Sequence, residues 1–108
     1  MSYKVKTISI FEKQARRLSR KYPSLKNDLL QLIKSLKENP GQGTALGNQC
    51  YKIRLAIKSK AKGKSGGARV VTHIVVYNTI VYLLSVYDKS EKADLSPGEL
   101  KQLLNEII

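Results

Sequence analysis

The stretch from Tyr51 to Arg69 holds the side chains best suited to chemistry on an anion. It contains seven Lys or Arg residues and no Asp or Glu. It begins as an alternating run in which Lys52 and Arg54 separate apolar residues, so a strand here would bury the apolar set and expose the cations. Four lysines then follow among glycines: Lys58, Lys60, Lys62 and Lys64. This pattern predicts a polyanion site made of strand-borne cations beside a lysine-rich loop.

Two further segments bring reactive side chains to the same predicted sheet. Arg69 opens a second alternating run, where a cation that enters an apolar strand needs a partner or a function. In the last strand, alternation puts Leu83, Ser85 and Tyr87 on one face, and Lys89 follows just beyond the strand end. We therefore expect one sheet face to gather Arg69 and Tyr87 with Lys52 and Arg54.

The single histidine and the single cysteine offer less chemistry. His73 is an alternative base, although a lone histidine in an apolar strand favours a structural role. Cys50 permits no internal disulfide and no cysteine-based metal cluster, and a buried place at a strand start suits it. We expect neither a metal nor another cofactor.

The charge of the chain is large and unevenly distributed. The 108 residues carry a formal net charge of +12. Residues 39–87 hold seven cations and no acid, whereas residues 88–108 hold five acids. A basic body with an acidic tail favours nucleic acid, an acidic partner protein, or both. The sequence lacks an apolar signal core and any run of about 18 apolar residues, so we expect a cytoplasmic protein with no membrane contact.

The first half of the chain predicts a strand and two helices. Residues 3–10 are rich in β-branched types and favour a strand. Apolar residues at helical spacing predict helices over residues 12–22 and 25–38, with Ser24 as the N-cap of the second. The opposite face of the first helix is cationic, with Lys13, Arg16, Arg17 and Arg20. Such a face is usually solvated, but it could bind RNA phosphates without reading sequence.

The second half predicts a polar connection, three strands and a final helix. The connection covers residues 40–49, and the strands follow over about 50–58, 68–77 and 79–88, the last two as a hairpin. The loop lysines should be mobile in the absence of RNA. Ser96 with Glu99 forms the capping box that starts the last helix. We expect one α/β (α+β) domain over residues 1–108, ordered β-α-α-β-β-β-α, with a mainly antiparallel sheet and the first two helices on one face.

Three segments resemble a known family: CYKIRLAIK, GKSGGARVV and YLLSVYDKSEKADLSPGELKQLL. They are similar to the RelE/ParE superfamily of bacterial type II toxins, nearest its HigB/RelE-like branch, and the element order matches along nearly the whole chain. The resemblance implies a RelE-like fold and a ribosome-dependent mRNA endonuclease, or mRNA interferase, that inhibits translation. It also implies a cognate antitoxin protein, the ribosomal A site and mRNA as partners.

The resemblance further implies roles for individual residues. Lys52 and Arg54 match the family's second-strand cations, and Arg69 matches its third-strand arginine. Tyr87 and Lys89 lie in the stretch that carries the remaining functional groups. Such enzymes direct a ribose 2′-oxygen onto the neighbouring phosphate, so the transition state needs charge stabilisation and proton transfer.

The role assignments follow from those needs. Arg69 would clamp the scissile phosphate, with further charge from Lys89 or from a loop lysine, Lys62 or Lys64. Tyr87 would position or protonate an oxygen, or stack a base. The best-known members place a catalytic tyrosine where this sequence has Leu95, so Tyr87 would have to substitute for it. The general base is left open among the lysines.

Three other functions fit parts of the sequence. A ParE-like toxin directed at gyrase would share the fold without cutting RNA. A non-catalytic RNA-binding module would use the same cationic surface, although one Phe and no Trp leave few aromatic side chains on which bases could stack. An inactive toxin retained as a partner-binding protein is the third.

Overall fold

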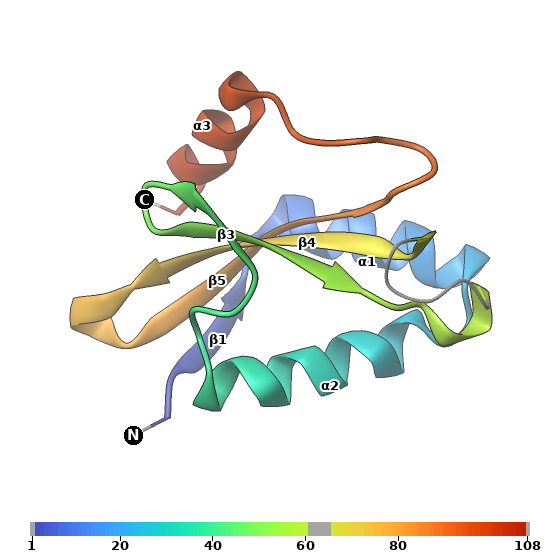
Figure 1. Ribbon diagram of the computed structural model, residues 1–108, viewed down its shortest axis with the longest axis horizontal. Helices are drawn as coiled ribbons and strands as arrows, with labels where there is room; N and C mark the ends of the chain where they lie inside the picture. Colours follow the sequence, from blue (N-terminus) through green and yellow to red (C-terminus); the bar gives the residue numbers. More distant parts are fainter. Residues whose placement is uncertain (1, 61–65, 108) are drawn as a thin grey trace.

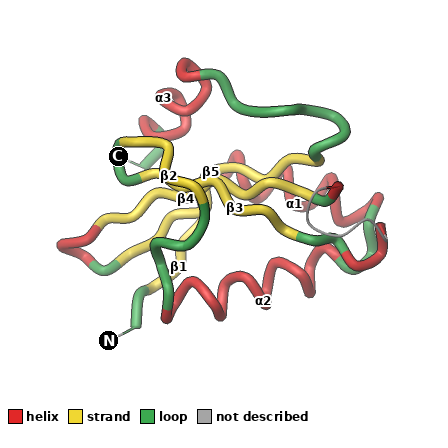
Figure 2. The backbone as a smooth tube through the Cα atoms, in the orientation of Figure 1, coloured by secondary structure: helices red, strands yellow, loops and turns green. Residues whose placement is uncertain are grey.

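The chain folds around one mixed β-sheet (Figure 1 and Figure 2). Within residues 2–60 and 66–107, which the computed structural model describes, it forms five strands and three α-helices. The strands are β1 (Lys4–Thr7), β2 (Thr44–Gly47), β3 (Cys50–Leu55), β4 (Ala68–Val75) and β5 (Ile80–Asp88). The α-helices are α1 (Ser9–Lys21), α2 (Leu25–Glu38) and α3 (Pro97–Asn105). Two short 3-10 helices lie between strands: η1 (Lys58–Lys60) between β3 and β4, and η3 (Val76–Asn78) between β4 and β5.

The sheet order is β1-β5-β4-β3-β2. β1 pairs with β5 in parallel, and the other three pairings are antiparallel. The prediction of a mainly antiparallel sheet is therefore confirmed. β4 lies at the centre of the sheet, so its two neighbours determine which side chains gather around it.

The helices form two layers around the sheet. α1 packs against β5, and α2 lies beside α1 and β1. Leu18, Leu25 and Leu36 from these two helices are fully buried. α3 and the connection 89–96 that leads to it lie on the other side of the sheet from α2 (Figure 1).

The first strand is shorter than predicted. β1 ends at Thr7, Ile8 has an extended backbone at the N-cap position, and the helix begins at Ser9. Turning into a helix here buries both Ile8 and Phe11, and Thr7 donates a hydrogen bond to the Glu12 carboxylate at 2.5 Å. Burial in the core therefore overrides the strand preference of the β-branched residues.

The predicted side-chain cap at Ser24 is wrong, whereas the capping box at Ser96 is confirmed. The Ser24 backbone is already helical, and its hydroxyl makes no N-cap hydrogen bond. Instead the Ser24 hydroxyl lies 2.8 Å from Asp28 Oδ2 and accepts a hydrogen bond from the backbone N–H of Ser59 at 2.8 Å. Ser24 thus ties the start of α2 to η1 rather than closing its own helix.

Residues 40–49 contain a strand that the sequence did not predict. β2 pairs antiparallel with β3 through a tight turn at Asn48 and Gln49, whose φ angles are +53° and +60°. Two successive left-handed residues suit a two-residue hairpin because they match the twist of the flanking strands. The turn was missed because it lacks the usual Asn-Gly or Asp-Gly signature.

A bulge in β5 changes which residues share a face. Val71 pairs with Ser85 but Thr72 pairs with Leu83, so Leu84 is an extra residue in β5. Because side chains alternate along a strand, the bulge moves Leu83 to the face opposite Ser85. The predicted common face of Leu83, Ser85 and Tyr87 is therefore wrong for Leu83.

The lysine-rich segment begins in an ordered turn. β3 ends at Leu55, earlier than predicted, and Lys58 lies in η1. The Asp28 carboxylate accepts a hydrogen bond from the Lys58 backbone N–H at 3.2 Å, so the start of η1 is bonded to α2. The rest of the predicted mobile loop, residues 61–65, lies outside the described residues, so its mobility stays a prediction.

Gly67 provides a test of how tightly β3 and β4 approach each other. A Cβ at Gly67 would lie 2.2 Å from the Leu55 carbonyl oxygen, whereas one at Gly41 would meet nothing closer than 3.9 Å. Overpacking of this kind costs about 1–3 kcal/mol, so we expect Gly67→Ala to lower the free energy of unfolding by that amount. Gly41→Ala is the matched control and should change it by less than about 0.5 kcal/mol. Urea denaturation measures both, and equal midpoints would contradict the close approach.

Candidate functional site

The pairing of three neighbouring strands places Arg54, Arg69 and Tyr87 side by side. Arg54 pairs with Arg69 across β3 and β4, and Arg69 pairs with Tyr87 across β4 and β5. Directly opposed residues point to the same face of a sheet. Lys52 lies two residues before Arg54 and shares that face. We call these three paired residues the site rung, and the side of the sheet that carries them and Lys52 the site face.

The site rung places two arginines directly opposite each other on neighbouring strands. Like charges directly opposite on neighbouring strands destabilise a sheet. Arg54 is exposed, whereas Arg69 is 5% exposed and donates a hydrogen bond from Nη1 to the Ala68 carbonyl at 3.1 Å. Guanidinium groups can each hold two oxygens of one anion, so this pair of arginines suits a phosphate.

Tyr87 stays protonated at neutral pH. Its side chain is buried, and its hydroxyl donates to Asp94 Oδ1 at 3.4 Å. Burial, followed by the nearby Asp94 carboxylate, raises the pKa of Tyr87 to about 12. A phenol with this pKa can donate a hydrogen bond or a proton, but it is a poor choice as a general base at cellular pH.

Asp94 lies in the connection before α3 and contacts two side chains of the site face, Tyr87 from β5 and Lys52 from β3. Its Oδ2 lies 3.2 Å from Lys52 Nζ, and its Oδ1 accepts the Leu95 backbone N–H at 2.9 Å. The Leu95 N–H and then the Lys52 ammonium hold the pKa of Asp94 below its usual range. The Asp94 side chain is 57% exposed, so water screens the ion pair and makes it weak. A polyanion could therefore displace this carboxylate from Lys52.

Three of the remaining predicted cations, Lys58, Lys60 and Lys89, lie just beyond the ends of β3 and β5. The Lys89 backbone N–H donates to the Gly67 carbonyl at 3.1 Å, and its side chain is exposed. Lys58 is also exposed. Lys60 differs, because its side chain is 10% exposed and its ammonium lies 2.6 Å from Asp88 Oδ1. Lys62 and Lys64 lie outside the described residues. RNA contact by these lysines stays a prediction.

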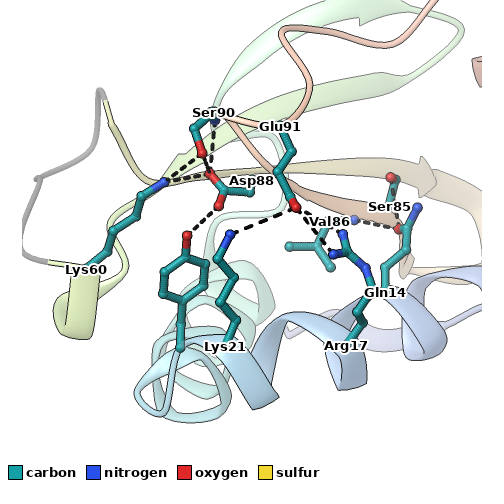
Figure 3. A network of polar contacts seen from close by, with 10 residues as sticks. Gln14, Arg17, Lys21, Lys60, Ser85, Val86, Asp88, Ser90 and Glu91 are labelled. Atoms are coloured by element: carbon teal, nitrogen blue, oxygen red, sulfur yellow. Dashed lines mark hydrogen bonds and ion pairs between the residues drawn. The ribbon is translucent and has the colours of Figure 1, made fainter.

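The cationic face of α1 is exposed but partly neutralised. Lys13, Arg16, Arg17 and Arg20 are all exposed. Arg17 lies 3.2 Å from Glu91, which also lies 4.0 Å from Lys21 Nζ (Figure 3). Glu91 belongs to the connection 89–96, so part of the acidic tail lies against this basic helix. RNA binding by the face stays a prediction.

His73 lies away from the site rung and has a structural environment. It pairs with Cys50 at the opposite end of the β3–β4 ladder, and its Nδ1 lies 3.5 Å from the Cys50 sulfur. Burial lowers the pKa of His73 and raises the pKa of Cys50 to about 11. Neither group is close enough to the site rung to take part in its chemistry.

Two acids near the site were missed by sequence reasoning. Asp94 had no sequence signal, because its partner Lys52 is 42 residues away. Asp88 did have one: it ends an apolar strand, where a buried charge needs a partner. The structure supplies that partner as Lys60.

No metal site and no membrane span emerge from the part of the chain that the structure describes. Residues 2–60 and 66–107 contain no cluster of three His, Cys, Asp or Glu side chains that could hold a metal ion. Among the same residues, no helix has the length and apolar character needed to cross a membrane.

Solved structures of two toxins share the fold. A doubly substituted E. coli toxin RelE in the free state is 20% identical, covers all of both chains and superimposes with a TM-score of 0.68. The RelBE2 toxin–antitoxin complex from Mycobacterium tuberculosis is 16% identical over 82% of this chain and 99% of that chain, with a TM-score of 0.60. The substituted E. coli toxin bound to an antitoxin peptide is 21% identical over 100% of this chain and 96% of that chain, with a TM-score of 0.53. At these identities the likeness shows the fold alone.

The sequence itself matches a family model. The match is to the RelE toxin of the RelE/RelB toxin-antitoxin system and covers residues 6–106. It therefore includes β3, β4, β5 and the whole site face. The resemblance in the sequence and the fold agree with this match, and the chain belongs to the RelE toxin family.

Proposed function

We propose that this chain is the toxin of a type II toxin–antitoxin system and cuts mRNA on the ribosome as an endoribonuclease. One observation carries the proposal: the site rung places two arginines and a protonated tyrosine together on the site face. Family membership over residues 6–106 supports the reaction class, because ribosome-dependent mRNA cleavage is typical of RelE toxins. Neither a gyrase-directed toxin nor a passive RNA-binding module requires this grouping.

The arginines stabilise the charge that develops on the scissile phosphate. When the ribose 2′-oxygen attacks the adjacent phosphorus, negative charge accumulates on the phosphate oxygens. Arg54 and Arg69 present two planar guanidinium groups, each able to contact two oxygens at once.

Tyr87 acts as the proton donor in the same step. The bond from phosphorus to the 5′ oxygen breaks, and that oxygen takes the Tyr87 proton, while the 2′ proton passes to a lysine or to water. The raised pKa of Tyr87 keeps the hydroxyl protonated before the reaction. Asp94 orients this hydroxyl and the Lys52 ammonium until RNA reaches the site face.

An antitoxin would neutralise the same surface. The chain has a net charge of +12, and an acidic segment in helical or extended form could cover the site face and prevent RNA binding. Solved structures of related toxins hold an antitoxin or an antitoxin peptide, which supports such a partner here.

The main prediction concerns Arg69. We expect Arg69→Ala to lower the rate of mRNA cleavage on programmed ribosomes by about 100- to 1000-fold, as loss of a preorganised donor does. Arg69→Lys should also be slow, because it keeps the charge but loses the two-pronged geometry. Because Arg69 is buried, Arg69→Met tests the charge with most of the side-chain volume retained.

Lys34→Ala, at an exposed position on α2, serves as the control for simple loss of charge and should cut at the parent rate. Circular dichroism checks the fold of each variant. A folded Arg69→Met variant that cleaves as fast as the parent would show that the chemistry lies elsewhere.

A second prediction uses the raised pKa of Tyr87. The phenol is favoured in its protonated form by folding, so its contribution to stability is complete below pH 10 and disappears as the pH rises to about 12. We expect the free energy of unfolding to fall more steeply over this interval in the parent than in Tyr87→Phe. Tyr77→Phe, at an exposed position, should follow the parent. Urea titrations at several pH values measure the slopes, and parallel curves for parent and Tyr87→Phe would disprove the pKa shift.

A third prediction concerns living cells. Expression of the intact protein in bacteria should stop growth, and co-expression of an acidic antitoxin should restore it, because the antitoxin covers the cationic surface. Primer extension on cellular mRNA should show new cleavage ends only in the arrested culture. Normal growth at high levels of the folded protein would argue against a toxin.

A further inference from the structure

Asp88 is the last residue of β5 and lies between two residues that are assigned to the chemistry. Tyr87 precedes it on the site face, and Lys89 follows it. Because side chains alternate along a strand, the Asp88 carboxylate points to the helix side of the sheet, where it is 0% exposed. A fully buried carboxylate is unusual and needs a specific set of partners.

The structure supplies those partners from three separate segments (Figure 3). Asp88 Oδ1 lies 2.6 Å from Lys60 Nζ and accepts hydrogen bonds from the Ser90 backbone N–H at 2.9 Å and the Ser90 hydroxyl at 2.8 Å. Asp88 Oδ2 accepts the Tyr22 hydroxyl at 2.6 Å. We call Tyr22, Lys60, Asp88 and Ser90 the Asp88 cluster.

The charge at the centre of this cluster is permanent. Burial alone would raise the pKa of Asp88, but the hydrogen bonds from Lys60, Tyr22 and Ser90 outweigh burial and lower it. Burial alone would also lower the pKa of Lys60, yet Asp88 raises it. The ion pair therefore persists across the physiological pH range, with both partners largely shielded from water.

A buried ion pair of this kind contributes little to net stability. Replacing both partners with neutral side chains is often neutral, whereas removing one partner leaves an uncompensated charge and is strongly destabilising. What the pair does supply is a defined position. It fixes the end of β5 against η1, where Asp28 and Ser24 also hold the backbone of Lys58 and Ser59.

The cluster also borders the start of β4. Asp88 pairs with Ala68, the residue before Arg69, and the Lys89 backbone N–H donates to the Gly67 carbonyl. Movement of the Asp88 carboxylate would therefore shift Tyr87, Lys89 and Arg69 together. Errors of about 1 Å in the placement of catalytic groups can lower a rate about 100-fold.

We propose that Asp88 is a positioning residue for the RNA cleavage assigned above: its buried carboxylate, held by Lys60, Tyr22 and Ser90, fixes the strand end that carries Tyr87 and Lys89 beside Arg69. Asp88 does not touch RNA, and Lys60 serves as its counter-ion rather than as an RNA ligand. The inference rests on the proposed function, but the placement itself can be tested without RNA.

The test compares the parent with the double variant Asp88→Asn/Lys60→Met, which removes both charges and should restore the stability that either single change loses. We expect the double variant to unfold at a urea midpoint close to that of the parent. On programmed ribosomes its kcat should be lower by about 10- to 100-fold, with KM within about twofold of the parent value.

Gln14→Met is the matched control. The Gln14 side-chain oxygen accepts hydrogen bonds from the Ser85 hydroxyl and the Val86 backbone N–H, both at 3.0 Å, so this variant also strips contacts from β5 (Figure 3). It leaves the Asp88 cluster intact. We expect it to lose stability and to retain the parent kcat.

Hydrogen exchange supplies a readout that needs no RNA. The amides of Lys89 and Ser90 should exchange faster in the double variant than in the parent, and the Val86 amide should not. Gln14→Met should show the reverse pattern. Unchanged exchange at Lys89 and Ser90 would overturn the positioning role, whatever the function of the protein.

The kinetic outcomes separate the remaining possibilities. A stable double variant with the parent kcat overturns the inference but leaves the proposed function standing. A raised KM with the parent kcat overturns it too, because Lys60 would then be an RNA ligand.

Should the double variant not fold, Tyr22→Phe is the second test, because it removes one hydrogen bond from the ionised Asp88. We expect it to lower kcat by a smaller factor than the double variant, with KM unchanged. An unchanged kcat in Tyr22→Phe overturns the inference, and a parent that cuts no mRNA overturns the proposed function as well.

Discussion

The pairing of β4 with both of its neighbours is the constraint on which the site depends. Arg54, Arg69 and Tyr87 are brought together because the β3–β4 and β4–β5 registers coincide at Arg69. A slip of one residue in either pairing would send Arg54 or Tyr87 to the helix side. The bulge at Leu84 lies beyond this point, so it alters the packing of Leu83 without disturbing the site rung.

The charged side chains have different partners on the two sides of the sheet. On the site face, two arginines stand next to each other, and the exposed Asp94 offsets Lys52 only weakly. On the helix side, the buried Asp88 has a complete set of donors and a dedicated counter-ion. The first arrangement groups cationic residues on one face, and the second holds the backbone at the end of the strand that carries Tyr87. Consecutive residues at the end of β5 thus serve opposite needs, because strand alternation points them to opposite faces.

Local chemistry explains which elements could be predicted and which could not. The capping box at Ser96 and the apolar stripes of α1 and α2 depend on residues a few positions apart, so they were correctly read from the sequence. The β2–β3 turn was missed because Asn48 and Gln49 adopt a backbone that their types do not demand. The Ser24 hydroxyl was misassigned because its partner, Ser59, arrives from a distant part of the chain.

By itself, the sequence indicated the family through the resemblance of three segments, and it determined the alternation that aligns Lys52 with Arg54, which depends only on spacing within one strand. It also indicated that Arg69 and Tyr87 belong with them. The polyanion site that it predicts from composition stays a prediction. Only the tertiary structure decided the register that makes the site rung, and only it placed Asp94 against Lys52 and Asp88 against Lys60. The physical reason is the distance along the sequence between interacting residues. Helix caps and strand alternation depend on near neighbours, whereas the partner of a charge depends on which distant segments the folded core brings together.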